Sequence, residues 1–142
     1  MMTNHIKMEF DARDENVSTA RVVVAAFLAK LNPTLEEVED VKVAVSEAVT
    51  NSIVHGYEKK EGSVFLEIFS YDNTVMISVR DMGCGIEDVQ KAKEPLFTTK
   101  PTEERSGLGF TVMESFMDSL HIESVVDHGT TVTMTKRIGR EK

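Results

Sequence analysis

The chain has 142 residues, of which 41% are hydrophobic and 28% charged; such values are typical of a globular domain that can bury a core, so we expect residues 1–142 to form a single domain. Its net charge of −8 argues against direct nucleic-acid binding, which needs a basic surface, and its one cysteine excludes a disulfide within the chain. The longest apolar run (22–29) is too short to span a bilayer and no signal-peptide hydrophobic region follows the N-terminal residues, so we expect a cytoplasmic protein without membrane contact.

The first elements are indicated by alternation and by a proline. Apolar and polar residues alternate over 5–11, which predicts a half-buried strand. An apolar helix is expected over 17–31, where Asn32 and Pro33 end it. Arg21 is one of the two charges on this helix, and it either faces a partner or lies along the surface with its charged end in water.

A second helix has a clear start signal. Thr34 and Glu37 have the spacing of a capping box, with Thr34 as the N-cap and Glu37 at the third helical position. The helix is therefore expected from Leu35 through Asn51. Gly56 is expected to be the left-handed residue that follows the helix C-terminus.

The rest of the chain alternates short strands with helices. The expected elements are strands at 64–71 and 75–80 joined by a tight turn, a short helix at 87–93, a loop at 96–106, a helix that starts after residue 109, and a last hairpin of strands at 120–126 and 131–137. Strands at both ends with helices between them predict an α+β two-layer sandwich.

The segment 47–56 contains the first candidate site. Glu47 and Asn51 interrupt a run of nearly all apolar or small residues, and their spacing places both on one helix face. A carboxylate can take a proton from a nucleophile, and an amide oxygen can ligate a hard cation such as Mg²⁺. The alternative is a partly solvated stripe with a structural role.

Three glycine motifs follow in the sequence. Asp81-x-Gly83-x-Gly85 comes directly after a predicted strand, where it forms either an ordinary turn or a close approach to a flat ligand with Asp81 as acceptor. Residues 105–109 precede a helix, whose N-terminal amides either attract phosphate or simply begin the helix. Gly129-Thr130 lies in the last hairpin. Neither a Walker motif nor the complete dinucleotide-binding glycine pattern is present.

In this order, Glu47-x₃-Asn51 and the three glycine motifs resemble the GHKL (Bergerat) ATP-binding fold, the superfamily of the gyrase, Hsp90, histidine-kinase and MutL-type proteins. Within it, Glu-Ala-Val-Thr-Asn followed by His-Gly-Tyr resembles the anti-sigma-factor serine kinases. The resemblance covers the chain from about the first strand to Lys136. It implies a mixed β-sheet with helices on one face, ATP and Mg²⁺ as cofactors, and a homodimer.

The resemblance also implies roles for individual residues. Asn51 would ligate Mg²⁺, Asp81 would hold the adenine amine, and residues 96–106 would form a lid over the nucleotide. Lys100 and Arg105 would be candidates for the γ-phosphate. The complete set of implied nucleotide-binding residues is Asn51, Asp81, Gly83, Gly85, Ile86, Thr99, Lys100, Arg105, Ser106, Gly107, Leu108, Gly109 and Thr130.

Glu47 bears on the type of kinase. An imidazole is already a nucleophile near neutral pH, whereas a hydroxyl needs a base. Histidine kinases typically carry Asn at the position of Glu47, and the four histidines of this chain fall in predicted strands, a helix end and a turn. Glu47 is therefore the expected catalytic base for a hydroxyl acceptor.

The implied function is sequestration of an alternative, sporulation-type sigma factor, together with phosphorylation of a serine on an anti-anti-sigma protein. Two other interpretations stay open. One is a nucleotide-gated protein-binding module with little transfer activity. The other is a detached histidine-kinase catalytic domain, which Glu47 disfavours.

Overall fold

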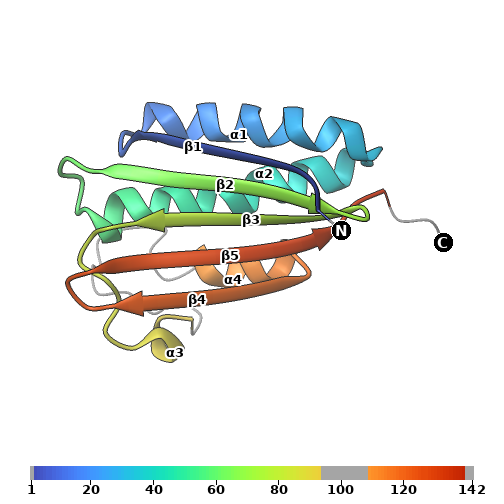
Figure 1. Cartoon of the computed structure of the whole chain (residues 1–142). Helices are drawn as coiled ribbons and strands as arrows, with labels where there is room; N and C mark the ends of the chain where they lie inside the picture. Colours follow the sequence, from blue (N-terminus) through green and yellow to red (C-terminus); the bar gives the residue numbers. More distant parts are fainter. Residues whose placement is uncertain (1, 94–108, 140–142) are drawn as a thin grey trace.

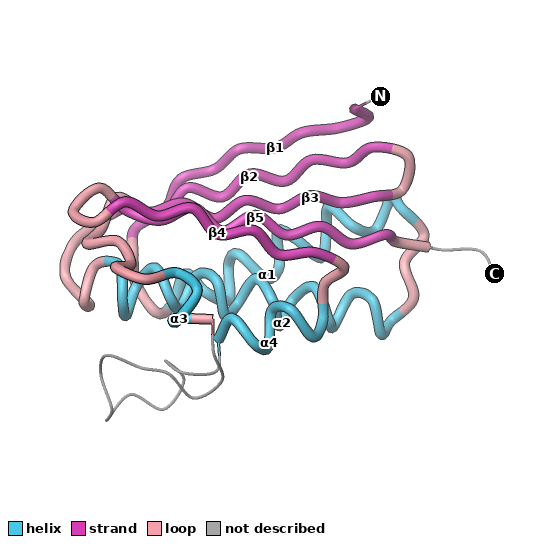
Figure 2. The backbone as a smooth tube through the Cα atoms, turned by 90° about the horizontal axis from the view of Figure 1, so that it is seen from below, coloured by secondary structure: helices cyan, strands magenta, loops and turns pink. Residues whose placement is uncertain are grey.

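A computed structural model describes residues 2–93 and 109–139 (Figure 1). The elements are β1 (Met2–Asp11), α1 (Glu15–Leu28), a 3₁₀ turn η1 (Ala29–Leu31), α2 (Leu35–Asn51), a π turn η2 (Ser52–Gly56), β2 (Ser63–Tyr71), β3 (Thr74–Asp81), α3 (Val89–Ala92), α4 (Gly109–Phe116), β4 (Ser119–Val125) and β5 (Gly129–Arg137). Figure 2 shows the strands in one layer and α1, α2 and α4 in a second layer. The expected α+β two-layer architecture is confirmed. None of the described helices is long and apolar enough to cross a membrane.

The described strands form one sheet in the order β1-β2-β3-β5-β4. All four pairings are antiparallel, whereas the resemblance implies a mixed sheet. The connections explain this difference. Two tight hairpins join β2 to β3 and β4 to β5, and β1 reaches β2 through α1 and α2. After α1 and α2 the chain is back at the end of the sheet where β1 ended, so β2 runs antiparallel to β1. A single helical crossover would instead place β2 parallel to β1.

The hydrophobic core lies between the sheet and the helices. Burial alternates along β2 and β3, so that every second side chain points toward the helix layer. Fully buried residues from both layers meet there, among them Val24, Leu28, Val41, Val45, Leu66, Ile77 and Met134. Burying a side chain of this size contributes roughly 1.5–3 kcal/mol. The core therefore fixes α2 against the centre of the sheet.

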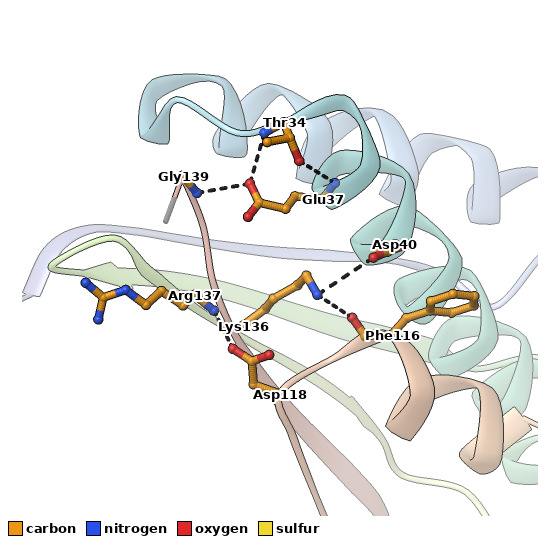
Figure 3. A network of polar contacts seen from close by, with 8 residues as sticks. All are labelled: Thr34, Glu37, Asp40, Phe116, Asp118, Lys136, Arg137 and Gly139. Atoms are coloured by element: carbon orange, nitrogen blue, oxygen red, sulfur yellow. Dashed lines mark hydrogen bonds and ion pairs between the residues drawn. The ribbon is translucent and has the colours of Figure 1, made fainter. Parts of the chain in front are cut away.

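The start of α2 is fastened to the last strand (Figure 3). The predicted capping box is present, with Thr34 Oγ1 accepting from the Glu37 amide and Glu37 Oε1 accepting from the Thr34 amide. Glu37 Oε1 also accepts from the Gly139 amide at 3.0 Å. Lys136 Nζ donates to the Phe116 carbonyl at 2.8 Å and lies 3.8 Å from Asp40 Oδ2. The end of β5 is thus connected to the first two turns of α2.

The end of α2 differs from the prediction. The α-helix ends at Asn51, as expected, but the chain continues as a π turn in which the Tyr57 amide donates to the Ser52 carbonyl at 2.9 Å. The prediction that Gly56 is the left-handed residue is wrong, because the first positive φ values after α2 belong to Glu58 and Lys59. Gly56 is instead required by a tertiary contact, described below.

Candidate functional site

A cavity of about 860 Å³ opens at the end of the sheet where α2 ends. Its described walls come from the end of α2 with η2, from residues 81–92, from the start of α4 and from the β4–β5 hairpin. Figure 1 shows the end of α2, the end of β3 and the β4–β5 turn at the same side of the molecule, at the left. A volume of this size is typical of a small-molecule site, for which the usual range is roughly 300–1,000 Å³.

The structure brings together five of the predicted nucleotide-binding residues, since the cavity is lined by Asn51, Asp81, Gly85, Ile86 and Thr130. Other predicted residues lie close by. Gly109 begins α4, and Glu47 lies on α2 one turn before Asn51 and is partly buried. The described part of the cavity wall does not include Glu47, Gly83 or Gly109. Thr99, Lys100, Arg105, Ser106, Gly107 and Leu108 lie outside the described residues.

Asp81 is the buried acid of this cavity. It is the last residue of β3 and only 5% exposed, and its Oδ1 accepts from the Gly83 amide at 2.9 Å. Burial raises its pKa, and hydrogen bonds from the Gly83 amide, the Ser52 hydroxyl and the Thr130 amide offset only part of this rise. A buried carboxylate lowers folding stability unless polar partners compensate for its lost hydration. Asp81 therefore favours a ligand group that donates a further hydrogen bond.

The π turn shapes the floor beneath Asp81. A methyl group on Gly56 would lie 2.8 Å from Asp81 Oδ1, so any side chain at this position would displace the carboxylate or the turn. The same turn places Ser52, which is also buried, where its hydroxyl bonds to the Asp81 carboxylate. Inserted π turns are frequent at functional sites because they redirect the residues that follow. Ser52 was not predicted as a site residue; the signal that could have indicated it is a small polar side chain directly after Asn51.

The loop after β3 is held on both sides by backbone contacts. A side chain on Gly83 would meet the Gly56 carbonyl at 2.1 Å, and one on Gly85 would meet the Val125 carbonyl at 2.4 Å. The Cys84 amide donates to the Gly56 carbonyl at 2.9 Å, and its carbonyl accepts from the Asp127 amide at 2.7 Å. The resemblance to the GHKL fold implies that these glycines give the base room. In the structure, close approach of the chain's own backbone already requires them.

A second part of the site combines the Asn51 side-chain amide with the start of α4. A methyl group on Gly109 would lie 3.0 Å from Asn51 Nδ2, so α4 begins directly beside the Asn51 side chain. The positive end of a helix dipole and its free amides favour phosphate. Asp81 and Asn51 therefore provide two chemically different groups in one cavity, one suited to an amino group and the other to an anion with its cation.

Comparisons with known proteins agree with this geometry. Residues 10–136 match the histidine kinase-like ATPase domain family. The chain is 54% identical to the anti-sigma F factor of Thermoanaerobacter sp. (strain X514) over 140 residues, which are 99% of this chain and 98% of that protein. It is 49% identical over 142 residues to the anti-sigma F factor of Bacillus subtilis (strain 168), covering 99% of this chain and 97% of that protein. The chain belongs to the anti-sigma F factor family.

Solved structures of other proteins share the fold of this chain. A structure of the RsbU and RsbW domains of a Mycobacterium tuberculosis protein aligns with a TM-score of 0.70 and 23% identity, covering 98% of this chain and 34% of that chain. The catalytic domain of the histidine kinase ThkA aligns with a TM-score of 0.60 and 18% identity, covering 94% and 96%. At these identities the likeness shows the fold alone.

Membership in this kinase-like ATPase family implies ATP binding, and the described residues fit that ligand. Asp81 can accept from an amino group, and Asn51 lies beside the start of α4. Within the described part of the chain, no group of three or more His, Cys, Asp or Glu side chains could hold a metal ion. A Mg²⁺ ion on Asn51 would take further ligands from phosphate and water, as is usual for this cation in nucleotide sites.

Proposed function

We propose that the protein is a Mg-ATP-dependent serine kinase that also sequesters an alternative, sporulation-type sigma factor. Its kinase substrate would be a serine of a small anti-anti-sigma protein. The observation that carries the proposal is the joint placement of Asp81 and Asn51 in one cavity, with Glu47 one turn earlier on the same helix. The name shared by the relatives, anti-sigma F factor, supports the sigma-factor part of the proposal.

In this proposal Asp81 and Asn51 have separate tasks. The Asp81 carboxylate accepts a hydrogen bond from the adenine amine, and Ser52 keeps that carboxylate in place. Asn51 ligates Mg²⁺ beside the start of α4, where the amides favour phosphate oxygens. Bound ATP supplies the transferable phosphoryl group, and Mg²⁺ neutralises the negative charge of its phosphates. Lys100 and Arg105, in the segment expected to be a lid, would contact the γ-phosphate.

Glu47 would act on the incoming protein. A serine hydroxyl is a weak nucleophile until a base accepts its proton, and a carboxylate on α2 near Asn51 can do this. Glu47 is not among the described residues of the cavity wall, which suits a base that serves a hydroxyl brought by a second protein. The alternative function, in which the domain is a nucleotide-gated binding module with little transfer activity, follows if Glu47 does not reach the incoming hydroxyl.

The partner surface in this proposal includes α1. Val22 is 67% exposed on this helix, directly after Arg21, so an apolar and a basic side chain are adjacent there. Arginine is enriched at protein interfaces, and the exposed Val22 adds apolar surface beside Arg21. We therefore propose Arg21 as a contact for the sigma factor or the kinase substrate, and a homodimer as the working assembly.

One experiment tests the proposal directly. The protein is mixed with γ-labelled ATP, Mg²⁺ and a candidate anti-anti-sigma protein, and the label on each protein is followed with time. Label on the second protein that resists acid but not alkali identifies a serine phosphate, whereas acid-labile label would indicate a phosphohistidine. Tight ATP binding without label transfer would replace the kinase proposal by the binding-module alternative.

A further inference from the structure

Tyr57 connects the π turn to the ends of two neighbouring strands. Its hydroxyl donates to the carbonyl of Ser63, the first residue of β2, at 2.6 Å, and accepts from the amide of Met82, directly after β3, at 2.7 Å. Its ring lies against Gly62, where an added methyl group would be 2.5 Å from Tyr57 Cε1. The position of the hydroxyl is therefore fixed by two hydrogen bonds to the backbone and by the packing of the tyrosine ring on Gly62.

The position of this hydroxyl in the sheet is unusual. Tyr71 and Thr74 close the two-residue turn between β2 and β3, and hydrogen-bonded pairs recur at every second position from such a closing pair. Continuing the register past Phe65 and Arg80 places Ser63 opposite Met82, at a hydrogen-bonded position. In an uninterrupted ladder, the Met82 amide would donate directly to the Ser63 carbonyl. The Tyr57 hydroxyl lies between these two groups and bonds to each of them, in place of the direct bond.

The insertion separates the strands at the point where the adenine side of the cavity begins. Beyond it the chain leaves β2, and the following amides bond elsewhere. The Gly83 amide donates to the Asp81 carboxylate, the Cys84 amide to the Gly56 carbonyl and the Ile86 amide to Ser124 Oγ. The loop 82–86 is thus directed toward η2 and the β4–β5 hairpin, which is the arrangement that lets Gly85 and Ile86 line the cavity.

We infer that Tyr57 is a positioning residue for the base-binding end of the site. Its hydroxyl replaces the direct hydrogen bond between the Met82 amide and the Ser63 carbonyl, so β2 and β3 do not pair at residue 82. The loop after β3 is thereby held where Asp81 can accept from an amino group. Tyr57 itself is not among the described residues of the cavity wall, so it acts through Met82 and the loop. The inference rests on the proposed nucleotide site and assigns the residue that shapes it.

The variant Tyr57→Phe tests this directly because it removes the hydroxyl and keeps the ring on Gly62. Without the hydroxyl, the Met82 amide can bond directly to the Ser63 carbonyl and draw the loop toward β2. We expect the KM for ATP to rise roughly threefold to tenfold, as for the loss of one or two neutral hydrogen bonds, and kcat at saturating ATP to stay within about twofold. Amide exchange at residues 82–86 should also change, with that of β1 unchanged.

Tyr71→Phe is the matched control, since Tyr71 is the other tyrosine of the chain and lies at the far end of β2. It should leave both kinetic constants at the wild-type values. Gly62→Ala provides a second variant in case Tyr57→Phe does not fold, because its methyl group would push the ring and displace the hydroxyl without removing it. It should raise the KM in the same way.

The possible outcomes separate the inference from the proposed function. If Tyr57→Phe and Gly62→Ala both keep the wild-type KM, Tyr57 does not position the site and the inference is wrong. A parallel fall of kcat and thermal stability, without a selective rise in KM, would show a purely structural role and also overturn it. If the wild-type protein itself does not bind ATP, the proposed function fails first, and the inference fails with it.

Discussion

The carboxylate of Asp81 lies directly over the Cα of Gly56, with no room between them for a methyl group. This contact joins the end of β3 to the π turn after α2, two segments that are separated by the whole of β2. It explains why the turn contains a glycine whose φ is not positive. It also makes the acid and the turn a single unit that can be tested by substitution.

Gly56→Ala should therefore damage the site more than the fold. The new methyl group would lie 2.8 Å from Asp81 Oδ1, so either the carboxylate or the turn must move. Overpacking of this kind destabilises by roughly 1–3 kcal/mol. We expect a folded protein with lower thermal stability and an ATP affinity at least about tenfold weaker by calorimetry. Wild-type affinity in a correctly folded variant would show that the contact is not needed for binding.

Asp81→Asn tests the adenine end of the site. The amide keeps an acceptor for the Gly83 amide but loses the charge, and a hydrogen bond to a charged group contributes roughly 1.5–3 kcal/mol. ATP affinity should fall about tenfold or more, and the preference for ATP over GTP should narrow, because GTP has a carbonyl where ATP has the amine. Asp127→Asn is the control, since it removes an exposed charge from the same cavity wall. An unchanged affinity in Asp81→Asn would remove Asp81 from the site.

The pH dependence should follow the raised pKa of Asp81, which burial causes. The ionised carboxylate accepts from the adenine amine more strongly than the protonated acid does, so ATP affinity should fall on acidification, starting at a higher pH than for a carboxyl with the ordinary pKa of 3.8. The free energy of unfolding depends on pH in the opposite direction. The contribution of Asp81 to stability is fully present below the unfolded pKa and is lost as the pH rises through the raised folded pKa. Affinity titrations of wild type and Asp81→Asn check this, because the variant should lack the acidic fall.

Glu47→Gln separates a kinase from a binding module. The amide keeps the shape of the side chain but cannot accept the serine proton, a role that contributes roughly 10²–10⁴-fold in rate. Phosphate transfer should therefore collapse, while Mg-ATP and sigma-factor binding persist. Asn51→Ala should instead lose nucleotide affinity and transfer together. Transfer at the wild-type rate in a folded Glu47→Gln variant would favour the binding-module alternative.

Glu37→Ala tests the connection between α2 and the end of β5. Burial acts to raise the pKa of Glu37, but hydrogen bonds from Gly139 and Thr34 outweigh it and leave the pKa below its usual value of 4.5. Its stabilisation is thus present above the unfolded pKa and is lost as the pH falls through the lowered folded pKa. Loss of the capping interactions should cost roughly 0.5–2 kcal/mol at neutral pH and little in strong acid. Glu36→Ala, in the same helical turn, is the control for the helix dipole; an equal loss in both variants would contradict the prediction.

Local rules predict much of this fold. The capping box of Thr34 and Glu37 and the two-residue turn at Asp72 and Asn73 depend on neighbouring residues, so they are visible in the sequence and present in the structure. The π turn at Ser52–Gly56 is different, because it depends on how Asp81 and Gly83 pack against it. The spacing of apolar residues in the sequence does not indicate such a contact between distant residues.

The candidate site shows the same division. The residues whose chemistry is distinctive, Asn51 and Asp81, can be nominated from motif order, and the structure places both in one cavity. The residues that bond to Asp81 or to the loop after it, Ser52, Tyr57 and Ser124, are common side chains whose partners are distant in sequence or lie in the backbone. Their hydrogen bonds exist only after the strands have paired, so the sequence alone does not reveal them.

The sheet order has a consequence for how the protein is made. Among the described strands β5 comes last in the sequence, yet it lies between β3 and β4 in the sheet. Until it leaves the ribosome, β4 has no described neighbour to pair with, and the cavity lacks Thr130 and Val132 from its wall. Contacts between distant parts of a chain also form slowly. The cavity wall is therefore complete only when β5 has joined the sheet, and a chain truncated before Gly129 should bind ATP more weakly than the full chain.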